Sequence, residues 1–150
     1  NSEFSGIAWG QGQLETTPLA LARMAGVIAN DGKLQPSRFV LKQAEKVIPK
    51  SGAIPLAKQQ GISSLLKGFM TEQSSAFFNG LAIAGKTGTP QRLVNHRFIN
   101  DGWYVFFADS PKLNAPLVVC IRIEGVKSSA KAVALAQQLI VPELQSLGYF

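Results

Sequence analysis

The sequence is poor in the residues that build metal sites and disulfides, since Cys120 is its only cysteine and His96 its only histidine. One cysteine excludes an intrachain disulfide and a thiolate zinc cluster. One histidine argues against a histidine-based metal centre and against a Ser-His-Asp triad. We therefore expect neither a metal ion nor a cofactor in this chain.

Long apolar runs and long basic runs are also absent. No run approaches the roughly 20 apolar residues that cross a bilayer, so we expect no transmembrane segment in this chain. The net charge of +6 is scattered, with no basic run of five or more, and we expect no nucleic-acid partner. Such a charge favours anionic partners, although solvation of the surface is the simpler role for most of these side chains.

The composition is that of a folded domain, and the 150 residues suit one domain. Hydrophobic residues make up 46% of the sequence and charged residues 16%, a balance that can form a core. The chain begins without methionine and without a signal peptide, which suggests a fragment of a longer protein.

A first helix is predicted to begin after Thr17, which can cap it, with Pro18 at the first helical position. Asn30-Asp31-Gly32 should end this helix, because Gly32 can adopt positive φ. Its expected buried face consists of Leu21, Met24, Ala25 and Ile28.

Two further helices are predicted from apolar periodicity. One covers residues 57–72, and its apolar stripe, which we expect to be buried, consists of Ile62, Leu65, Leu66, Phe69 and Met70. The other ends the chain: Ser128 or Ser129 can cap it, and Pro142 should kink or restart it. The apolar side of this last helix consists of Ala132, Leu135, Ala136, Leu139 and Ile140.

Three strands are predicted between these helices, over Leu81–Pro90, Trp103–Ala108 and Leu117–Glu124. The second is apolar on both faces and should be central. A turn beginning at Asp109 should join the last two as an antiparallel hairpin. Only short extended pieces are expected over residues 33–55. This order of elements predicts an α+β fold, with a three-stranded antiparallel sheet packed by helices.

The segment Gly85-Lys86-Thr87-Gly88-Thr89 on the first predicted strand carries the clearest chemistry. Lys86 offers an ammonium group to an anion, and Thr87 and Thr89 offer hydroxyl donors. Gly88 lets a ligand lie against the backbone, and an edge strand can also pair with an extended peptide. Since strand side chains alternate, Lys86 and Thr87 should serve one ligand only if the strand lies at an edge or is twisted.

A phosphate-binding loop is the competing interpretation of the same residues. Gly80 precedes Gly85-Lys86-Thr87 at the spacing of the G-x-x-x-x-G-K-[ST] motif. Such a loop opens a helix, whereas here the intervening residues are apolar and Pro90 follows. A nucleotide binder is therefore a remote alternative.

Three ordered blocks resemble the penicillin-binding transpeptidase family. They are Gly10–Leu19 with the helix ending at Ala29–Gly32, the strand Ala84–Gln91, and Trp103–Ala108 followed by the strand ending at Glu124. The resemblance covers most of residues 1–150 and implies the C-terminal portion of a β-lactamase-like transpeptidase domain. Members of this family are extracytoplasmic serine acyltransferases, commonly membrane-anchored, that join peptidoglycan stem peptides and bind β-lactams.

By this resemblance, Lys86, Thr87, Gly88 and Thr89 form the substrate-binding strand for a stem peptide or β-lactam carboxylate. The family also carries a Ser-x-x-Lys nucleophile and a Ser-x-Asn motif upstream of that strand. No Ser-x-Asn string precedes Lys86 here. We therefore expect no catalytic residue in this chain and no acylation by the chain alone, with the N-terminal half of the domain as its missing partner.

Two Ser-x-x-Lys strings are present but are interpreted as decoys. Ser64 to Lys67 falls in the second predicted helix, between residues of its apolar stripe. Ser128 to Lys131 follows the binding strand, which is the wrong order, and a helix cap explains it. A non-catalytic binding or interaction module on the same fold remains the alternative function.

Smaller features have simpler interpretations. Trp103 and Tyr104 are expected in the core, although they could line a glycan groove. His96 and Arg97 are expected in a solvated loop, and Cys120 as a buried small side chain. Glu124 is expected to pair with Arg122 or Lys127 at the surface.

Overall fold

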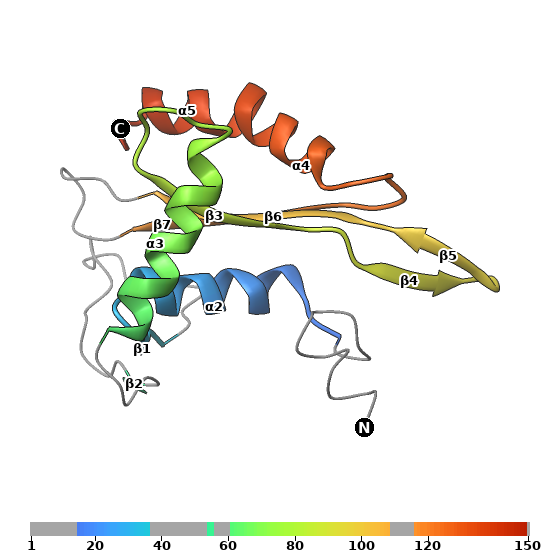
Figure 1. The fold of residues 1–150 in the computed structure, drawn as a ribbon, viewed down its shortest axis with the longest axis horizontal. Coiled ribbons are helices and arrows are strands. Elements are labelled where there is room, and N and C mark those ends of the chain that lie inside the picture. Colours follow the sequence, from blue (N-terminus) through green and yellow to red (C-terminus); the bar gives the residue numbers. More distant parts are fainter. Residues whose placement is uncertain (1–14, 37–53, 56–60, 109–115, 150) are drawn as a thin grey trace, which may run out of the picture.

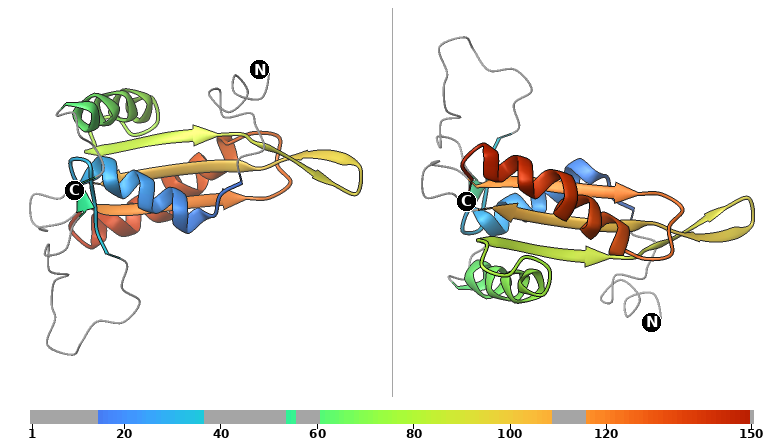
Figure 2. Two further views of the ribbon diagram at one scale, coloured as in Figure 1. Left: turned by 90° about the horizontal axis from the view of Figure 1, so that it is seen from below. Right: turned by 90° about the horizontal axis from the view of Figure 1, so that it is seen from above.

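The computed structural model describes residues 15–36, 54–55, 61–108 and 116–149. A three-stranded antiparallel sheet forms its centre, in the order β3 (Ile83–Gly88), β6 (Gly102–Ala108), β7 (Leu117–Ile123). Helix α2 (Pro18–Ala29) covers one face, and α4 (Ala130–Leu135) and α5 (Val141–Ser146) cover the other (Figures 1 and 2). The α+β prediction, with a three-stranded antiparallel sheet, is confirmed.

Helix α2 begins as its sequence predicts. The Thr17 hydroxyl accepts a hydrogen bond of 3.1 Å from the Ala20 N–H, and Pro18 occupies the first turn. Gly32, at φ 81°, follows the end of the helix. Ala25 and Ala29 are buried against the sheet, but Met24 is 62% exposed, so the expected burial of Met24 is wrong.

Helix α3 (Ile62–Ser75) lies beside the beginning of β3 (Figure 2). Its apolar stripe exists, but only Met70 is buried. Ile62, Leu65, Leu66 and Phe69 are 41–61% exposed, so the expected burial of the stripe is wrong for these four. The described part of the chain contains no element that covers this side of the helix. Residues 57–60 of the predicted helix lie outside the described residues.

The final helix is interrupted, as Pro142 predicts. A π-helical segment, Ala136–Ile140, joins α4 to α5, in which Pro142 lies in the first turn. A wider turn accommodates a residue that has no N–H and that crowds the preceding carbonyl. Ala132, Ala136 and Leu144 are buried, whereas Leu139 is 61% exposed, contrary to expectation.

The strand prediction holds for the sheet but misses a ribbon. Strand β6 is central, with both Tyr104 and Phe107 buried on its opposite faces. Beyond the sheet, β4 (Gln91–Val94) and β5 (Arg97–Asn100) form a projecting hairpin (Figure 1). The turn between predicted strands β6 and β7, residues 109–115, lies outside the described residues. The extended pieces within the described part of 33–55 are β1 (Lys33–Leu34) and β2 (Ile54–Pro55).

The projecting hairpin and the sheet share one register. Pairs run from Ile83 with Ala108 to Gly88 with Trp103, and they continue from Gln91 with Asn100 to Val94 with Arg97. Asn95 and His96, both at positive φ, form the two-residue turn. His96 therefore lies in a tight turn and Arg97 in a strand, so the prediction of a simple loop is wrong.

Two core clusters hold the layers together. The larger lies under α4 and α5 and includes Tyr104 and Phe106, whose rings stack with centroids 5.1 Å apart. The predicted inward face of β7 belongs to it, with Ile121 buried and its neighbours Leu117, Val119 and Ile123 half-buried. The smaller cluster lies between α2, α3 and the sheet and includes Ala25, Met70 and Phe107.

Candidate functional site: the edge strand and its cavity

Strand β3 is an edge strand among the described residues, since it pairs with β6 alone. Helix α3 covers its beginning, and the end of the strand extends past the helix (Figure 2). Lys86, Thr87 and Gly88 lie on this end. Lys86 and Thr87 lie on opposite faces of the strand, and they can contact one ligand if the strand lies at an edge. The position of β3 meets this condition.

A cavity of about 430 Å³ lies beside the end of β3. Lys86, Thr87 and Gly88 all line it, together with Trp103 of β6 and Arg122 of β7. The remaining lining residues come from the segment before α2, from α2, from β6 and from the chain between β3 and β6: Glu15, Thr16, Leu21, Pro90, Gln91, Arg92, Asp101 and Val105. We call this the strand-end cavity.

The four residues of the predicted binding strand differ in their surroundings. Lys86 is exposed, and its Nζ donates to the Thr87 carbonyl oxygen at 3.0 Å. Thr87 and Gly88 are half-buried. Thr89 is half-buried and does not line the cavity; its hydroxyl oxygen accepts a hydrogen bond of 3.2 Å from the Ser129 N–H. The structure thus brings three of the four residues to one cavity.

The two glycines of this strand have different environments. A Cβ on Gly85 would lie 2.7 Å from the Tyr104 hydroxyl and 2.8 Å from the Phe106 Cβ. The Tyr104 ring crosses the strand there to reach Ser74 on α3, at 3.0 Å between the two hydroxyl oxygens. A Cβ on Gly88 would meet only the Trp103 Cβ, at 3.8 Å, an ordinary contact. Internal packing therefore explains why residue 85 is a glycine, but it does not require a glycine at residue 88.

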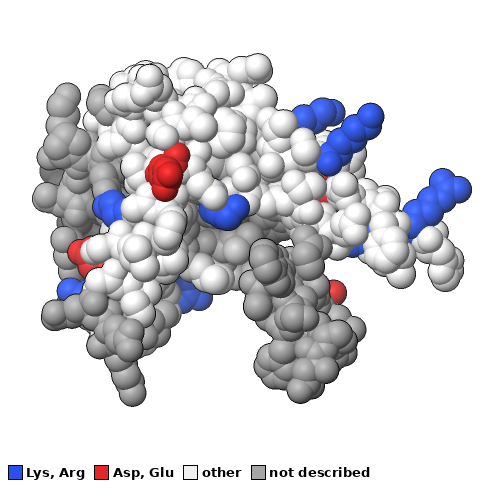
Figure 3. Space-filling view, in the orientation of Figure 1, with Lys and Arg blue, Asp and Glu red and all other residues white. Residues whose placement is uncertain are grey.

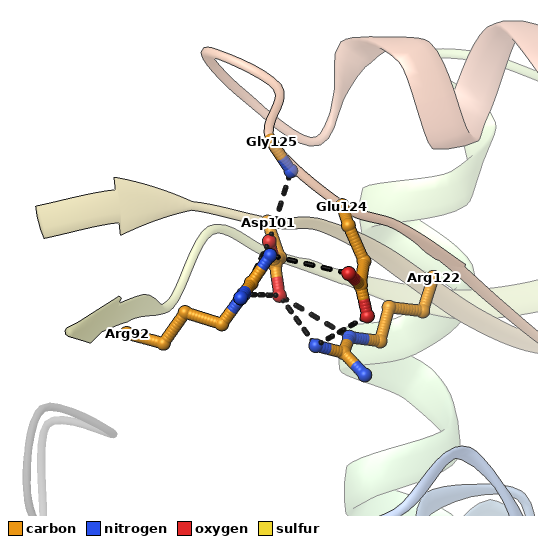
Figure 4. Close-up of polar contacts among 5 residues, drawn as sticks. All are labelled: Arg92, Asp101, Arg122, Glu124 and Gly125. Atoms are coloured by element: carbon orange, nitrogen blue, oxygen red, sulfur yellow. Dashed lines mark hydrogen bonds and ion pairs between the residues drawn. The ribbon is translucent and has the colours of Figure 1, made fainter. Parts of the chain in front are cut away.

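A buried carboxylate at the base of the hairpin was missed by the sequence analysis. Asp101 is 2% exposed and lies between two guanidinium groups (Figure 4). Arg92 Nε is 2.9 Å from its Oδ2, Arg122 Nη2 is 2.8 Å from the same oxygen, and the Gly125 N–H donates to Oδ1 at 3.0 Å. The signal for it in the sequence is a single acidic residue just before the predicted apolar strand Trp103–Ala108.

The charges around Asp101 are balanced. Glu124 also pairs with both bases, at 3.0 Å to Arg122 and 3.2 Å to Arg92, which confirms the expected surface pair with Arg122. Burial alone would raise the pKa of the Asp101 carboxyl, but the hydrogen bonds from Arg122, Gly125 and Arg92 outweigh burial and hold that pKa below its usual value.

Trp103 belongs both to the core and to the cavity wall. It is 9% exposed, as expected for a core residue, yet it lines the strand-end cavity. The Arg122 guanidinium lies over its ring, with Cζ 5.4 Å from the centroid. Tyr104 is fully buried, and burial, partly offset by the Ser74 hydrogen bond, raises its pKa to about 12.

Neither Ser-x-x-Lys string lies at the cavity. Ser64 is on the exposed side of α3, and the Lys67 Nζ lies over the Phe107 ring at 5.6 Å from its centroid. Ser128 precedes α4, and its hydroxyl oxygen accepts from the Ala130 N–H at 3.3 Å in a local turn; the N-cap residue is Ser129, whose side chain makes no capping bond. Cys120 is half-buried in β7, and burial raises the pKa of its thiol.

The geometry excludes a phosphate loop. Lys86 lies within strand β3 rather than in a loop, and β4, not a helix, follows Pro90. No helix N-terminus is available at this position to cradle phosphates. Within the described ranges, no cluster of three or more His, Cys, Asp or Glu residues could hold a metal ion. The helices of the described residues are all too short or too polar to cross a membrane.

Comparison with known proteins identifies the family of this chain. Residues 1–141 match the penicillin binding protein transpeptidase domain, and the chain belongs to this family. The resemblance seen in the sequence is thereby confirmed.

Three curated relatives resemble the chain. It is 29% identical over 129 residues to a probable peptidoglycan D,D-transpeptidase, PenA, of Neisseria flavescens, covering 81% of this chain and 31% of the relative. It is 27% identical to the peptidoglycan D,D-transpeptidase PbpA of Mycolicibacterium smegmatis, covering 85% and 28%. Penicillin-binding protein 3 of Bacillus subtilis is 26% identical, with 79% and 19% covered. The chain thus spans about a third or less of the length of these relatives.

Proposed function

We propose that this chain supplies the substrate-binding strand of a peptidoglycan D,D-transpeptidase, which cross-links stem peptides by serine acyl transfer and is acylated by β-lactams. The observation that carries the proposal is the end of β3. There, Lys86 and Gly88 border a cavity, and Gly88 leaves room that internal packing does not require. An extended peptide or β-lactam can lie along such an edge.

The charges at the cavity support an anionic ligand group near Lys86. Arg92 and Arg122 are both engaged by Asp101 and Glu124. No carboxylate of the described residues forms an ion pair with Lys86. A substrate carboxylate would therefore find its partner at Lys86, with the Thr87 hydroxyl beside it. The same cation would stabilise negative charge that develops during acyl transfer.

Thr89 has a narrower role in this proposal than Lys86. Its hydroxyl oxygen already accepts from the Ser129 N–H. A hydroxyl that accepts one hydrogen bond still has its own proton to donate. We propose that Thr89 forms a hydrogen bond to the far end of the bound ligand, either with that hydroxyl proton or with its backbone groups.

The nucleophile is proposed to come from the part of the domain that precedes this chain in its relatives. An apolar groove of about 430 Å³ lies between α2 and α3, and Lys86 lines both this groove and the strand-end cavity. We define the α2–α3 groove by Leu21, Met24, Ala25, Ile28, Leu66, Phe69, Met70, Gln73, Lys86 and Val105. A helical segment seated there would present its side chains next to Lys86. We propose that the Ser-x-x-Lys segment occupies it.

The proposal is tested by β-lactam acylation of the full-length protein. Lys86→Ala should lower the second-order acylation rate at least tenfold while leaving the thermal unfolding midpoint nearly unchanged, because Lys86 is exposed. Lys131→Ala is the matched control, since Lys131 is exposed on α4 on the opposite face and belongs to a Ser-x-x-Lys string. Equal acylation in Lys86→Ala and the parent would refute the assigned role.

A non-catalytic binding module is the second candidate. It is favoured by the absence of a Ser-x-x-Lys string at the cavity within the described residues. Labelled penicillin distinguishes the two: the full-length enzyme should be labelled covalently, whereas a binding module should bind β-lactam or stem peptide only reversibly. For both candidate functions, we propose that the chain belongs to a membrane-anchored protein and lies outside the cytoplasm, where peptidoglycan is assembled.

A further inference from the structure

Asp101 stands out among the described residues because it is a charged side chain that is almost completely buried. Four groups from two other segments of the chain, residues 90–92 and 122–125, meet at it. Its N–H donates to the Pro90 carbonyl oxygen at 3.0 Å, and its carboxylate accepts from Arg92 of β4, from Arg122 of β7 and from the Gly125 N–H (Figure 4). A buried carboxylate is strongly destabilising unless such partners compensate it.

Asp101 lies where the chain that follows β3 leaves the sheet. The Asp101 N–H fixes Pro90, two residues after Gly88. One residue earlier, the Thr89 hydroxyl oxygen accepts a hydrogen bond from the Ser129 N–H, which comes from the segment before α4. Gly102 makes that contact possible, because a Cβ there would lie 2.7 Å from the Ser128 carbonyl oxygen. The chain just beyond Lys86 and Gly88 is thus held by two contacts, a backbone bond across the ribbon at Pro90 and the Ser129 bond at Thr89.

A line of contacts also joins Asp101 to the cavity wall. Asp101 orients the Arg122 guanidinium through Nε and Nη2, at 3.2 and 2.8 Å. That guanidinium lies over Trp103, whose Cβ is the nearest atom to the space beside Gly88. Loss of the carboxylate would leave the Arg122 guanidinium held by the exposed Glu124 alone, and its position over the indole ring that forms the wall would no longer be fixed.

We propose that Asp101 is a positioning residue for the acyl-transfer reaction. It fixes the end of β3 and engages Arg92 and Arg122, so that a ligand anion is directed to Lys86 and not to either arginine. This inference rests on the proposed function. Asp101 borders the strand-end cavity, but its carboxylate is engaged by Arg92, Arg122 and Gly125. It therefore acts through the backbone at Pro90 and through Arg122.

The test compares single variants of the full-length protein in β-lactam acylation at increasing drug concentration. Asp101→Asn keeps the shape but removes the charge that two guanidiniums share. We expect the limiting acylation rate to fall at least tenfold, with the apparent affinity for the β-lactam within threefold of the parent. Hydrogen exchange of the amides of residues 86–89 and of residue 101 should also become faster, which reports the loss of positioning directly.

Glu124→Gln is the matched control, because Glu124 contacts the same two arginines but its side chain is 59% exposed. We expect less than a twofold change in the acylation rate and unchanged exchange. Arg122→Lys, which keeps the charge but loses the fork and the contact with Trp103, should lower the limiting rate about three- to tenfold. If Asp101→Asn does not fold, Arg122→Lys decides the question.

A parent-like limiting rate in Asp101→Asn, or in Arg122→Lys where that variant decides, would overturn the inference. So would an equal loss in Glu124→Gln, since surface charge alone would then explain the effect. Lys86→Ala in the same series separates this failure from failure of the proposed function. If Lys86→Ala is also unaffected, the function itself is wrong; if it loses activity while Asp101→Asn does not, only the positioning role is wrong.

Discussion

At the scale of single residues, the two glycines around Lys86 have separable reasons for being glycine. Gly85 has no side chain because the Tyr104 ring and Phe106 occupy that space. Gly88 faces only an ordinary contact with Trp103. The motif therefore combines one residue that the fold requires with one that the fold would allow to change.

This difference predicts opposite outcomes for two alanine substitutions. Gly85→Ala should lower the free energy of unfolding by about 1–3 kcal/mol, because its Cβ would overlap Tyr104 and Phe106. Gly88→Ala should change it by less than about 0.5 kcal/mol, yet should slow β-lactam acylation of the full-length protein. Urea unfolding and acylation rates measure both. A large stability loss in Gly88→Ala would show that packing, not ligand approach, explains that glycine.

Asp101 predicts a pH dependence in acid. Because hydrogen bonds from Arg122, Gly125 and Arg92 outweigh burial and lower the pKa of its carboxyl, the stability that it contributes is present above about pH 4. That contribution is lost as the pH falls through the lowered pKa. Asp101→Asn should cost about 2 kcal/mol near neutral pH, and less at about pH 2.

The measurement is the free energy of unfolding of Asp101→Asn and of the parent chain across this pH range. Glu124→Gln serves as control and should show a difference of less than about 0.5 kcal/mol at neutral pH, because exposed ion pairs contribute little. A difference between Asp101→Asn and parent that grows toward low pH would have the wrong sign for this account.

At the scale of elements, α3 is attached to the sheet through one buried polar contact. Ser74 on α3 is 1% exposed and Tyr104 on β6 is fully buried, and their hydroxyl groups lie 3.0 Å apart. The rest of the helix surface is largely exposed, so this contact and Met70 account for much of its docking.

Ser74→Ala should therefore destabilise the chain by about 1–3 kcal/mol, because the Tyr104 hydroxyl would remain buried without its partner. The double variant Ser74→Ala/Tyr104→Phe should recover part of this loss, since both polar groups are then absent. Thermal unfolding of the four members of the cycle gives the coupling energy. Strict additivity would contradict a direct hydrogen bond between the two side chains.

The elements also show where sequence patterns are sufficient. Thr17 and Pro18 define the start of α2 through local capping, and the doubly apolar strand around Tyr104 defines the centre of the sheet. Local chemistry and alternation carry that information. The α3 stripe was correctly located, but its burial could not be inferred, because burial depends on what packs against the helix.

The same limit applies to the site. The Lys86–Thr89 segment was visible in the sequence, but the network around Asp101 was not. Its members lie far apart in the chain, from Arg92 to Gly125, and only the register of the strands brings them together. The β4–β5 ribbon was missed because its two-residue turn, Asn95-His96, lacks the glycine that usually marks such turns.

At the scale of the whole molecule, one side of the protein exposes an unusual amount of apolar surface. Leu66 and Phe69 of α3 and Met24 of α2 line the α2–α3 groove and are 41–62% exposed, and Leu65, the neighbour of Leu66 on α3, is 61% exposed. In Figure 3, charged side chains on the described surface of this side are isolated and most of it is uncharged. Apolar patches of this kind commonly mark interfaces.

We expect the isolated chain to self-associate through this side. Phe69→Ser should shift it toward monomer, because it removes apolar surface at the groove. Phe98→Ser is the matched control: Phe98 is 74% exposed but lies on the distant β4–β5 hairpin. Sedimentation velocity over a range of concentrations provides the measurement. Equal effects of the two substitutions would argue against the groove as the associating surface.

The shared register of the sheet and the ribbon has a consequence for insertions and deletions. A residue inserted between Gly88 and Gln91 would shift β3 against β6 and turn Lys86 to the opposite face. Residues added at the Asn95–His96 turn would lengthen only the ribbon, because the Asp101–Pro90 hydrogen bond holds the register at its base. Homologous chains can therefore vary in length at the tip of this hairpin, whereas we expect no insertion or deletion at its base.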